Sequence, residues 1–129
     1  WIPIRYLARG YERDELAGLY RLARVGLVTP LQDGMNLVAK EYIAAQDPED
    51  PGVLVLSQFA GAAEQMKEAL IINPHDRDAV ADAVLTALNM PLAERKRRWR
   101  ALYDGICRQD ITWWRGHFLA AFDSDPAGI

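Results

Sequence analysis

Short apolar runs alternate with amphipathic stretches over the first ninety residues of the chain. The runs at residues 25–30, 53–57 and 69–74 are almost entirely apolar, which is typical of strands that are covered on both faces of a parallel sheet. The segments between them carry apolar side chains every three or four residues, as on one face of a helix. This alternation predicts an α/β fold built on a parallel sheet.

A fourth strand is expected at the beginning of the chain. Residues 2–7 are β-prone, and they precede a segment in which apolar residues recur at helical spacing, with Asp14 as the expected N-cap. Four strand–helix units therefore predict a doubly wound, Rossmann-like sheet with helices on both faces.

The spacing of apolar residues also predicts which side of each later helix faces inward. After the run at 25–30, the inward stripe is Met35, Val38, Ala39, Tyr42 and Ile43. After the run at 53–57, a loop at 58–61 leads into a short Ala-rich helix that ends near Lys67. The next helix begins near Asp76 or Asp78, and its inward stripe is Val80, Val84, Leu85 and Leu88.

From residue 91 to residue 122 the pattern is helical only. One stripe consists of Trp99, Leu102, Tyr103 and Ile106, and a second consists of Ile111, Trp114, Phe118 and Phe122. A break at 109–110 separates the two, and the pattern predicts a closing helical tail that packs on the sheet.

Two features of this tail have a functional and a structural interpretation. The basic run 95–98 could bind phosphate or acidic lipid, but on an amphipathic helix it is expected to be the solvated face, and we assign it no function. The pair Trp113 and Trp114 could be a sugar-stacking platform, although aromatic residues at helical spacing usually pack in a core or an interface.

Length, charge and cysteine content narrow the function classes. A chain of 129 residues, half of them apolar, is long enough for one domain or part of one. The net charge of −3 gives no basic footprint for nucleic acid, and no apolar run approaches the roughly 18 residues of a membrane span. Cys107 is alone, so we expect a small apolar side chain on a helix in a reducing, cytoplasmic compartment. The first residue, Trp1, is not an initiator Met, which indicates a fragment.

The segment 33–41 carries the candidate chemistry. It follows a buried strand, and the first amides of its helix, from Met35 to Val38, could bind a diphosphate where the helix dipole favours negative charge. Gly34 permits close approach, Asp33 could accept hydrogen bonds from sugar hydroxyls, and Glu41 could accept both hydroxyls of a ribose. Alternatively, Asp33 only caps the helix and Glu41 only pairs with a neighbouring base. The residues alone leave both interpretations open.

The sequences of residues 25–42 and 51–63 resemble the alpha,alpha-trehalose-phosphate synthases, glycosyltransferase family 20. The resemblance runs from about Ile4 to Phe122 and includes Asn73-Pro74 and the segment that begins at Met90. It implies the C-terminal part of a GT-B protein, in which two Rossmann-like domains enclose the donor site. Residues 1–129 would then be a nucleotide-sugar-binding domain fragment that lacks its N-terminal partner domain.

The resemblance also implies roles for particular residues. Backbone amides near Leu37 and Val38 would reach the diphosphate, Glu41 would bind the ribose and Asp33 the glucose, while Tyr11 would touch the nucleobase through its main chain. The implied substrate-binding residues are Tyr11, Asp33, Gly34, Met35, Asn36, Leu37, Val38, Ala39, Lys40 and Glu41. Gln32 departs from the family, where Arg is expected, and this change would weaken a salt bridge or phosphate attraction.

The implied activity is retaining glucosyl transfer from UDP-glucose to glucose 6-phosphate, which gives trehalose 6-phosphate and UDP. No side chain is expected to be a general base or nucleophile, and neither a metal nor a cofactor is expected. Alternatives are a transferase that uses GDP- or ADP-glucose, a pseudoglycosyltransferase, and a non-catalytic nucleotide-sugar-binding domain. The chain alone is expected to fold without catalysing, and its uncovered aromatic tail favours self-association into a homo-oligomer.

Overall fold

The computed structural model of the protein describes residues 2–123. The two ends of the domain predicted over residues 1–129, Trp1 and the residues up to Ile129, lie outside the described residues. The elements are α1 (Arg13–Leu22), β1 (Val25–Val28), α2 (Leu37–Ala45), β2 (Val53–Ser57), the 3₁₀ turn η1 (Gly61–Glu64), β3 (Leu70–Ile72), α3 (Arg77–Asn89), α4 (Leu92–Arg108) and α5 (Ile111–Asp123). The strands form one parallel sheet in the order β1-β2-β3. The predicted α/β class is confirmed.

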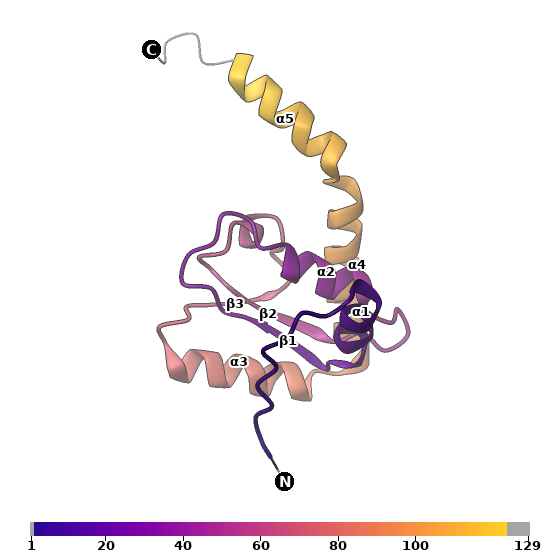
Figure 1. Cartoon of the computed structure of the whole chain (residues 1–129), viewed down its shortest axis with the longest axis vertical. Coiled ribbons are helices and arrows are strands. Elements are labelled where there is room, and N and C mark those ends of the chain that lie inside the picture. Colours follow the sequence, from indigo (N-terminus) through magenta and orange to yellow (C-terminus); the bar gives the residue numbers. More distant parts are fainter. Residues whose placement is uncertain (1, 124–129) are drawn as a thin grey trace.

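Helices cover both faces of this sheet. Figure 1 shows α3 on one face and α2 with α4 on the other. Side chains of β2 alternate between the two layers, because Leu54 and Leu56 join the core under α2 and α4 while Val53 and Val55 pack towards α3. All five residues of β2 are buried, as its apolar run predicts.

Tyr42 fixes α2 against the amino ends of the strands. Its hydroxyl donates a 2.9 Å hydrogen bond to the Ala23 carbonyl, and burial raises the pKa of this phenol to about 12. A Cβ at Gly26 would lie 2.9 Å from the tyrosine ring, and a Cβ at Gly52 would collide with its hydroxyl. Both positions therefore admit only glycine while Tyr42 stays in place.

Helix α4 is joined to the sheet layer by two buried polar side chains. The Trp99 indole donates to the Ile43 carbonyl at 3.0 Å. The Arg95 guanidinium donates to Asp50 at 2.6 Å and also to the Pro51 carbonyl, and its side chain is only 8% exposed. The prediction that run 95–98 is wholly solvated was therefore wrong for Arg95, whose position on α4 faces the turn before β2.

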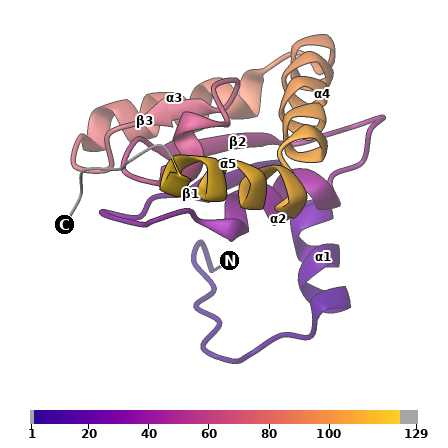
Figure 2. The same cartoon turned by 90° about the horizontal axis from the view of Figure 1, so that it is seen from above.

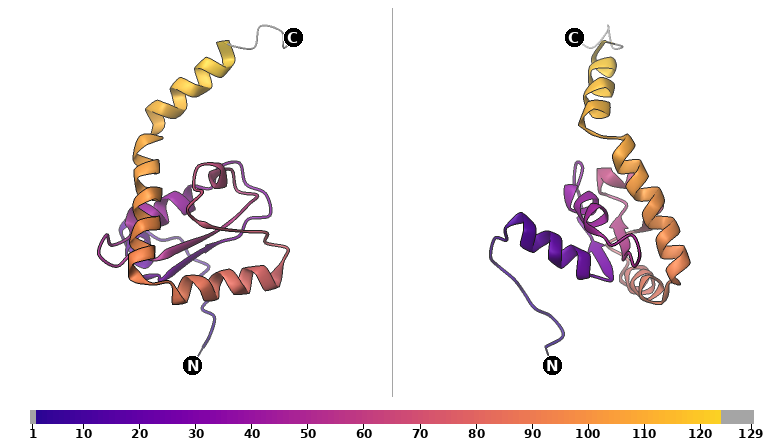
Figure 3. Two further views of the ribbon diagram at one scale, coloured as in Figure 1. Left: turned by 180° about the vertical axis from the view of Figure 1, so that it is seen from behind. Right: turned by 90° about the vertical axis from the view of Figure 1, so that its right-hand side faces the viewer.

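Helix α5 does not pack on the sheet, contrary to the prediction. It continues beyond α4 and points away from the sheet (Figures 1 and 3). Its apolar stripe is exposed, with 77% of Ile111 and 78% of Phe122 accessible to solvent. Ile111 and Trp114 border a shallow groove of about 470 Å³ together with Met35 and Leu37, and both side chains stay exposed there. Cys107 lies on a helix as expected, near the end of α4, and its side chain is exposed.

The beginning of the chain also differs from the prediction. Residues 2–7 form no strand, since Pro3 lacks an amide proton and the segment is exposed with no strand beside it. The N-cap of α1 is Glu12, so Asp14 lies inside the first turn, where its charge favours the helix dipole. Figure 2 shows α1 beside α2, on the far side from α4.

Three smaller predictions along the chain were also wrong. Leu27 in β1 is 49% exposed, because β1 is an edge strand of the described sheet and α3 covers it only in part. Leu85 and Leu88 are exposed, since the small residues Ala83 and Ala87 face the sheet and let α3 approach it. The Ala-rich segment forms only the single turn η1.

None of the described helices combines the length and apolar character needed to cross a membrane.

We expect Arg95→Ala to destabilise the protein by about 1 to 3 kcal/mol, because the substitution leaves the buried Pro51 carbonyl without its donor. Lys96→Ala is the matched control, since the neighbouring Lys96 pairs with Glu49, which is 86% exposed, and its loss should cost less than about 1 kcal/mol. Urea unfolding followed by circular dichroism measures both values. Equal losses of stability in the two variants would contradict the assigned role of Arg95.

Candidate functional site

The loops that follow the three parallel strands meet at one edge of the sheet. The loop after β2 is joined to the end of β3, because the Gln58 amide donates to the Ile72 carbonyl at 2.9 Å. The ring of Phe59 meets the ring of His75 edge to face, with centroids 6.0 Å apart. In open α/β sheets, ligands bind outside the carboxyl ends of the strands, so this edge is the candidate site.

The loop between β1 and α2 is held by backbone hydrogen bonds to the loop after β2. The Asp33 amide donates to the Phe59 carbonyl at 3.1 Å, and the Gly61 amide donates to the Asp33 carbonyl at 3.0 Å. The Ala62 amide then donates to the Met35 carbonyl at 2.7 Å. These three bonds extend the β1–β2 pairing past the strands, as the isolated parallel bridge between Asp33 and Ala60 also shows.

Asn36 is the residue that starts α2. Its backbone is left-handed, with φ of 73°, and its side-chain oxygen accepts a 3.0 Å hydrogen bond from the Ala39 amide. Asn tolerates this conformation better than other non-glycine residues do. The cap is therefore Asn36, and the alternative in which Asp33 caps the helix was wrong.

The carboxylate of Asp33 is oriented by the residues that follow it. One oxygen accepts from the Met35 amide at 3.2 Å, and the other accepts from the Asn36 side chain at 3.0 Å. The side chain is only partly buried, so lone pairs remain for a ligand at the surface.

Two backbone amides at the start of α2 remain free. Within residues 2–123, neither the Leu37 amide nor the Val38 amide has a hydrogen-bond acceptor. Their side chains are 63% and 43% exposed, so this helix end is open to solvent. The Ala39 amide is bound to Asn36, and its side chain is fully buried, so Ala39 contributes to the fold.

Lys40 and Glu41 point to different surroundings. The Lys40 ammonium donates to the Gln65 side chain at 2.7 Å, and partial burial lowers the pKa of this amine. Glu41 lines a shallow groove of about 440 Å³ between α1 and α2, next to Tyr20. Burial, and secondarily the charge of Glu41, raises the pKa of Tyr20. Glu41 forms no ion pair with any described residue, so the alternative in which it only pairs with a base was wrong.

Tyr11 lies just before α1, where the guanidinium of Arg9 sits 4.4 Å from the centre of its ring. No hydrogen bond joins it to segment 33–41 among the described residues. The structure thus brings Asp33 and the amides of α2 together, while Tyr11 is not connected to them.

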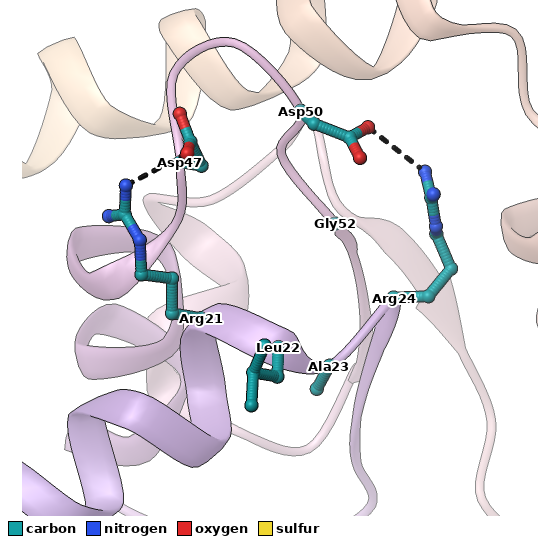
Figure 4. Close-up of a pocket in the computed structure, with 7 residues that line it drawn as sticks. All are labelled: Arg21, Leu22, Ala23, Arg24, Asp47, Asp50 and Gly52. Atoms are coloured by element: carbon teal, nitrogen blue, oxygen red, sulfur yellow. Dashed lines mark hydrogen bonds and ion pairs between the residues drawn. The ribbon is translucent and has the colours of Figure 1, made fainter.

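A cavity of about 260 Å³ lies at the opposite edge of the sheet, before β1 and β2 (Figure 4). Its charged side chains form two pairs, Arg21 with Asp47 at 2.9 Å and Arg24 with Asp50 at 3.3 Å. Because these charges neutralise each other, the cavity has little to offer a charged ligand. Residues 2–123 contain no cluster of three or more metal-ligating side chains.

Sequence reasoning missed the contribution of loop 58–61 to this site. Its residues were predicted only to connect a strand to a helix, yet their backbone groups hold the loop that contains Asp33. The glycine at position 61, in the loop that follows a buried strand, was the available signal of a close backbone approach.

The sequence model of glycosyltransferase family 20 matches residues 1–124. The chain belongs to this family. A curated family member, the trehalose-6-phosphate synthase of Sinorhizobium fredii, is 56% identical over 119 residues, which are 92% of this chain and 26% of that protein.

Solved structures of the family agree with the fold. An alpha,alpha-trehalose-phosphate synthase (UDP-forming) from Burkholderia xenovorans, in complex with glucose-6-phosphate, is 54% identical with a TM-score of 0.90 over 96% of this chain and 27% of that one. A structure from E. coli bound with UDP-2-fluoro glucose is 54% identical with a TM-score of 0.89 over 96% of this chain and 28% of that one. The chain thus spans about a quarter of the length of its relatives.

The two roles of Asn36, cap and left-handed residue, can be separated by substitution. Asn36→Ala should cost about 2 kcal/mol, because it loses the cap and leaves in a left-handed backbone a residue without the polar side chain that makes this conformation tolerable for Asn. Asn36→Gly should cost only a few tenths of a kcal/mol, since glycine tolerates this φ. Urea unfolding measures both, and an alanine variant as stable as the glycine variant would contradict this account of the helix start.

Proposed function

We propose that this chain is the donor-binding part of a longer enzyme that transfers glucose from UDP-glucose to glucose 6-phosphate with retention, giving trehalose 6-phosphate and UDP. The curated relative carries the name of this activity, and related structures hold glucose-6-phosphate or UDP-2-fluoro glucose. In this proposal the acceptor site and the other half of the cleft belong to an N-terminal domain outside the chain.

The observation that carries the proposal is the pair of free amides at the start of α2. The Leu37 and Val38 amides lie at the end of the helix where the macrodipole is worth roughly half a positive charge. Amides in this position bind phosphate groups. The amides that would bind this diphosphate follow the oriented carboxylate of Asp33 by four and five residues in the chain, a short separation that suits a nucleotide sugar.

Asp33 and Glu41 would recognise the two sugars of the donor. Asp33 accepts two hydrogen bonds from its own loop, and its free lone pairs would accept from glucose hydroxyls. Glu41 lies one turn after Leu37 on α2 and is exposed without a basic partner among the described residues, so it can accept both ribose hydroxyls.

The charges of the segment also indicate what the rest of the enzyme must supply. Lys40, the only cation in segment 33–41, is hydrogen-bonded to Gln65, so it is not directed at the free amides. Two helix amides cannot neutralise a leaving diphosphate, and its stabilisation would require basic residues from the N-terminal domain. We propose that this chain orients the donor and that chemistry occurs where the two domains meet.

Retention is proposed to follow from the position of the acceptor. Segment 33–41 offers no nucleophile placed for a covalent intermediate, since both of its carboxylates have binding roles. The acceptor hydroxyl would attack from the face that the diphosphate leaves, which makes positioning and charge stabilisation the main contributions of the protein.

Two substitutions should separate binding of the nucleotide from binding of the glucose. In the full-length protein, Glu41→Gln should weaken UDP affinity by about 1 to 3 kcal/mol through loss of a charge-assisted bond.

Asp33→Ala should lower the rate of trehalose 6-phosphate formation strongly while UDP affinity stays nearly constant. Calorimetry measures UDP affinity, and mass spectrometry of the product from UDP-glucose and glucose 6-phosphate measures turnover.

Thermal melts without ligand control for folding, since both variants should melt close to the parent protein. An unchanged UDP affinity in Glu41→Gln would remove the ribose assignment, and a parallel loss of affinity and turnover in Asp33→Ala would remove the glucose assignment. Product formed from GDP- or ADP-glucose, and not from UDP-glucose, would contradict the proposed donor.

A further inference from the structure

The backbone of Gly61 touches the backbone of the loop that precedes α2. A Cβ built on Gly61 would collide with the Gly34 carbonyl oxygen, would lie 2.9 Å from the Gly34 carbonyl carbon and would lie 3.4 Å from the Met35 Cα. All three atoms are main-chain atoms. No side chain can rotate away to make room, so an added methyl group must move one loop or the other.

Neither loop is free to move at this point. The contact is bracketed by the hydrogen bonds from the Gly61 amide to the Asp33 carbonyl and from the Ala62 amide to the Met35 carbonyl. On the other side, the buried Ser57 hydroxyl accepts from the Phe59 amide at 3.1 Å, which fixes the beginning of the loop after β2. Ala62 is fully buried, so its side chain holds the end of the same loop in the core.

Glycines elsewhere in residues 2–123 do not have this relation to the loop. Gly26 and Gly52 are also crowded, but the atoms nearest to them belong to Tyr42 and to the segment before β1. Gly18 on α1 and Gly105 on α4 have open space where a Cβ would lie. Gly61 has no left-handed backbone, so its requirement for glycine is close approach and not conformation.

We propose that Gly61 is a positioning residue for the donor. Because Gly61 has no side chain, the Gly34 carbonyl can contact its backbone, and this contact determines where Asp33 and the free amides of α2 lie. This proposal rests on the proposed function, because it assumes that the loop before α2 binds a nucleotide sugar. Gly61 itself touches no substrate in this arrangement. It acts through the backbone of Gly34 and Met35.

Gly61→Ala should therefore impair both parts of donor binding. The displaced backbone lies between Asp33 and Leu37, so the carboxylate and the first free amide should both shift. A misplacement of about 1 Å can cost on the order of 100-fold in rate. We expect the KM for UDP-glucose to rise at least about tenfold and kcat to fall, with UDP affinity falling in parallel, which distinguishes this variant from Asp33→Ala.

The experiment compares the full-length protein with Gly61→Ala and with Gly18→Ala, whose new methyl group points into open space on α1. Steady-state kinetics gives KM and kcat for UDP-glucose, and calorimetry gives UDP affinity well below the melting temperature. Amide hydrogen exchange, followed by mass spectrometry of peptides covering 31–36 and 58–62, reports on the contact without any ligand. The expected result is faster exchange and weaker donor binding in Gly61→Ala, with parental values in Gly18→Ala.

Three other outcomes would count against a role of Gly61 in donor binding. Parental KM and UDP affinity in Gly61→Ala would overturn it. If Gly61→Ala does not fold, amide exchange in the parent protein decides, and rapid exchange at the Gly61 and Ala62 amides, whose hydrogen bonds bracket the contact, would overturn it. If the parent protein binds neither UDP nor UDP-glucose, the proposed function fails. Unchanged amide exchange at 31–36 in Gly61→Ala would show separately that Gly61 does not fix the position of the loop before α2.

Discussion

The candidate site depends on main-chain contact between two loops at the carboxyl edge of the sheet. The three hydrogen bonds between the loop after β2 and residues 33–35 continue the β1–β2 pairing beyond the last strand residues. They hold the chain directly before Asn36, whose left-handed backbone and side chain start α2. The open amides and the oriented Asp33 carboxylate are consequences of this contact, since both lie within four residues of it.

The other end of α2 is held as firmly, which makes the helix a fixed support for the site. Gln46 is buried just past the last turn, where its amide group donates to the Tyr20 carbonyl at 2.6 Å and its oxygen accepts from the Gly52 amide at 2.7 Å. Tyr42 adds a hydrogen bond to the Ala23 carbonyl one turn earlier. Rigid supports of this kind keep binding groups in place before a ligand arrives, which lowers the entropic cost of binding.

The sequence predicted the elements whose pattern is decided locally. The apolar run of β2 and the beginning of α3 near Asp76 were correct because strand burial and helix starts leave a signal within a few residues. Arg95 was misassigned because its burial depends on Asp50, 45 residues away. The contact at Gly61 was missed for the same reason, and α5 was placed on the sheet because an apolar stripe shows that a helix has a partner without showing where that partner lies. For the donor site, residue roles came from family resemblance, and geometry tested only the two structural alternatives, capping by Asp33 and pairing of Glu41 with a base.

The most direct test of the account is an NMR titration of the ¹⁵N-labelled protein with UDP, read at individual backbone amides. We expect the largest shift changes at Leu37 and Val38, because these amides are free and would bind the diphosphate. The Ala39 amide, already bound to Asn36, should change less. Shift changes confined to the cavity before β1 and β2, around Arg21 and Arg24, would contradict the assignment of the start of α2 as the donor site.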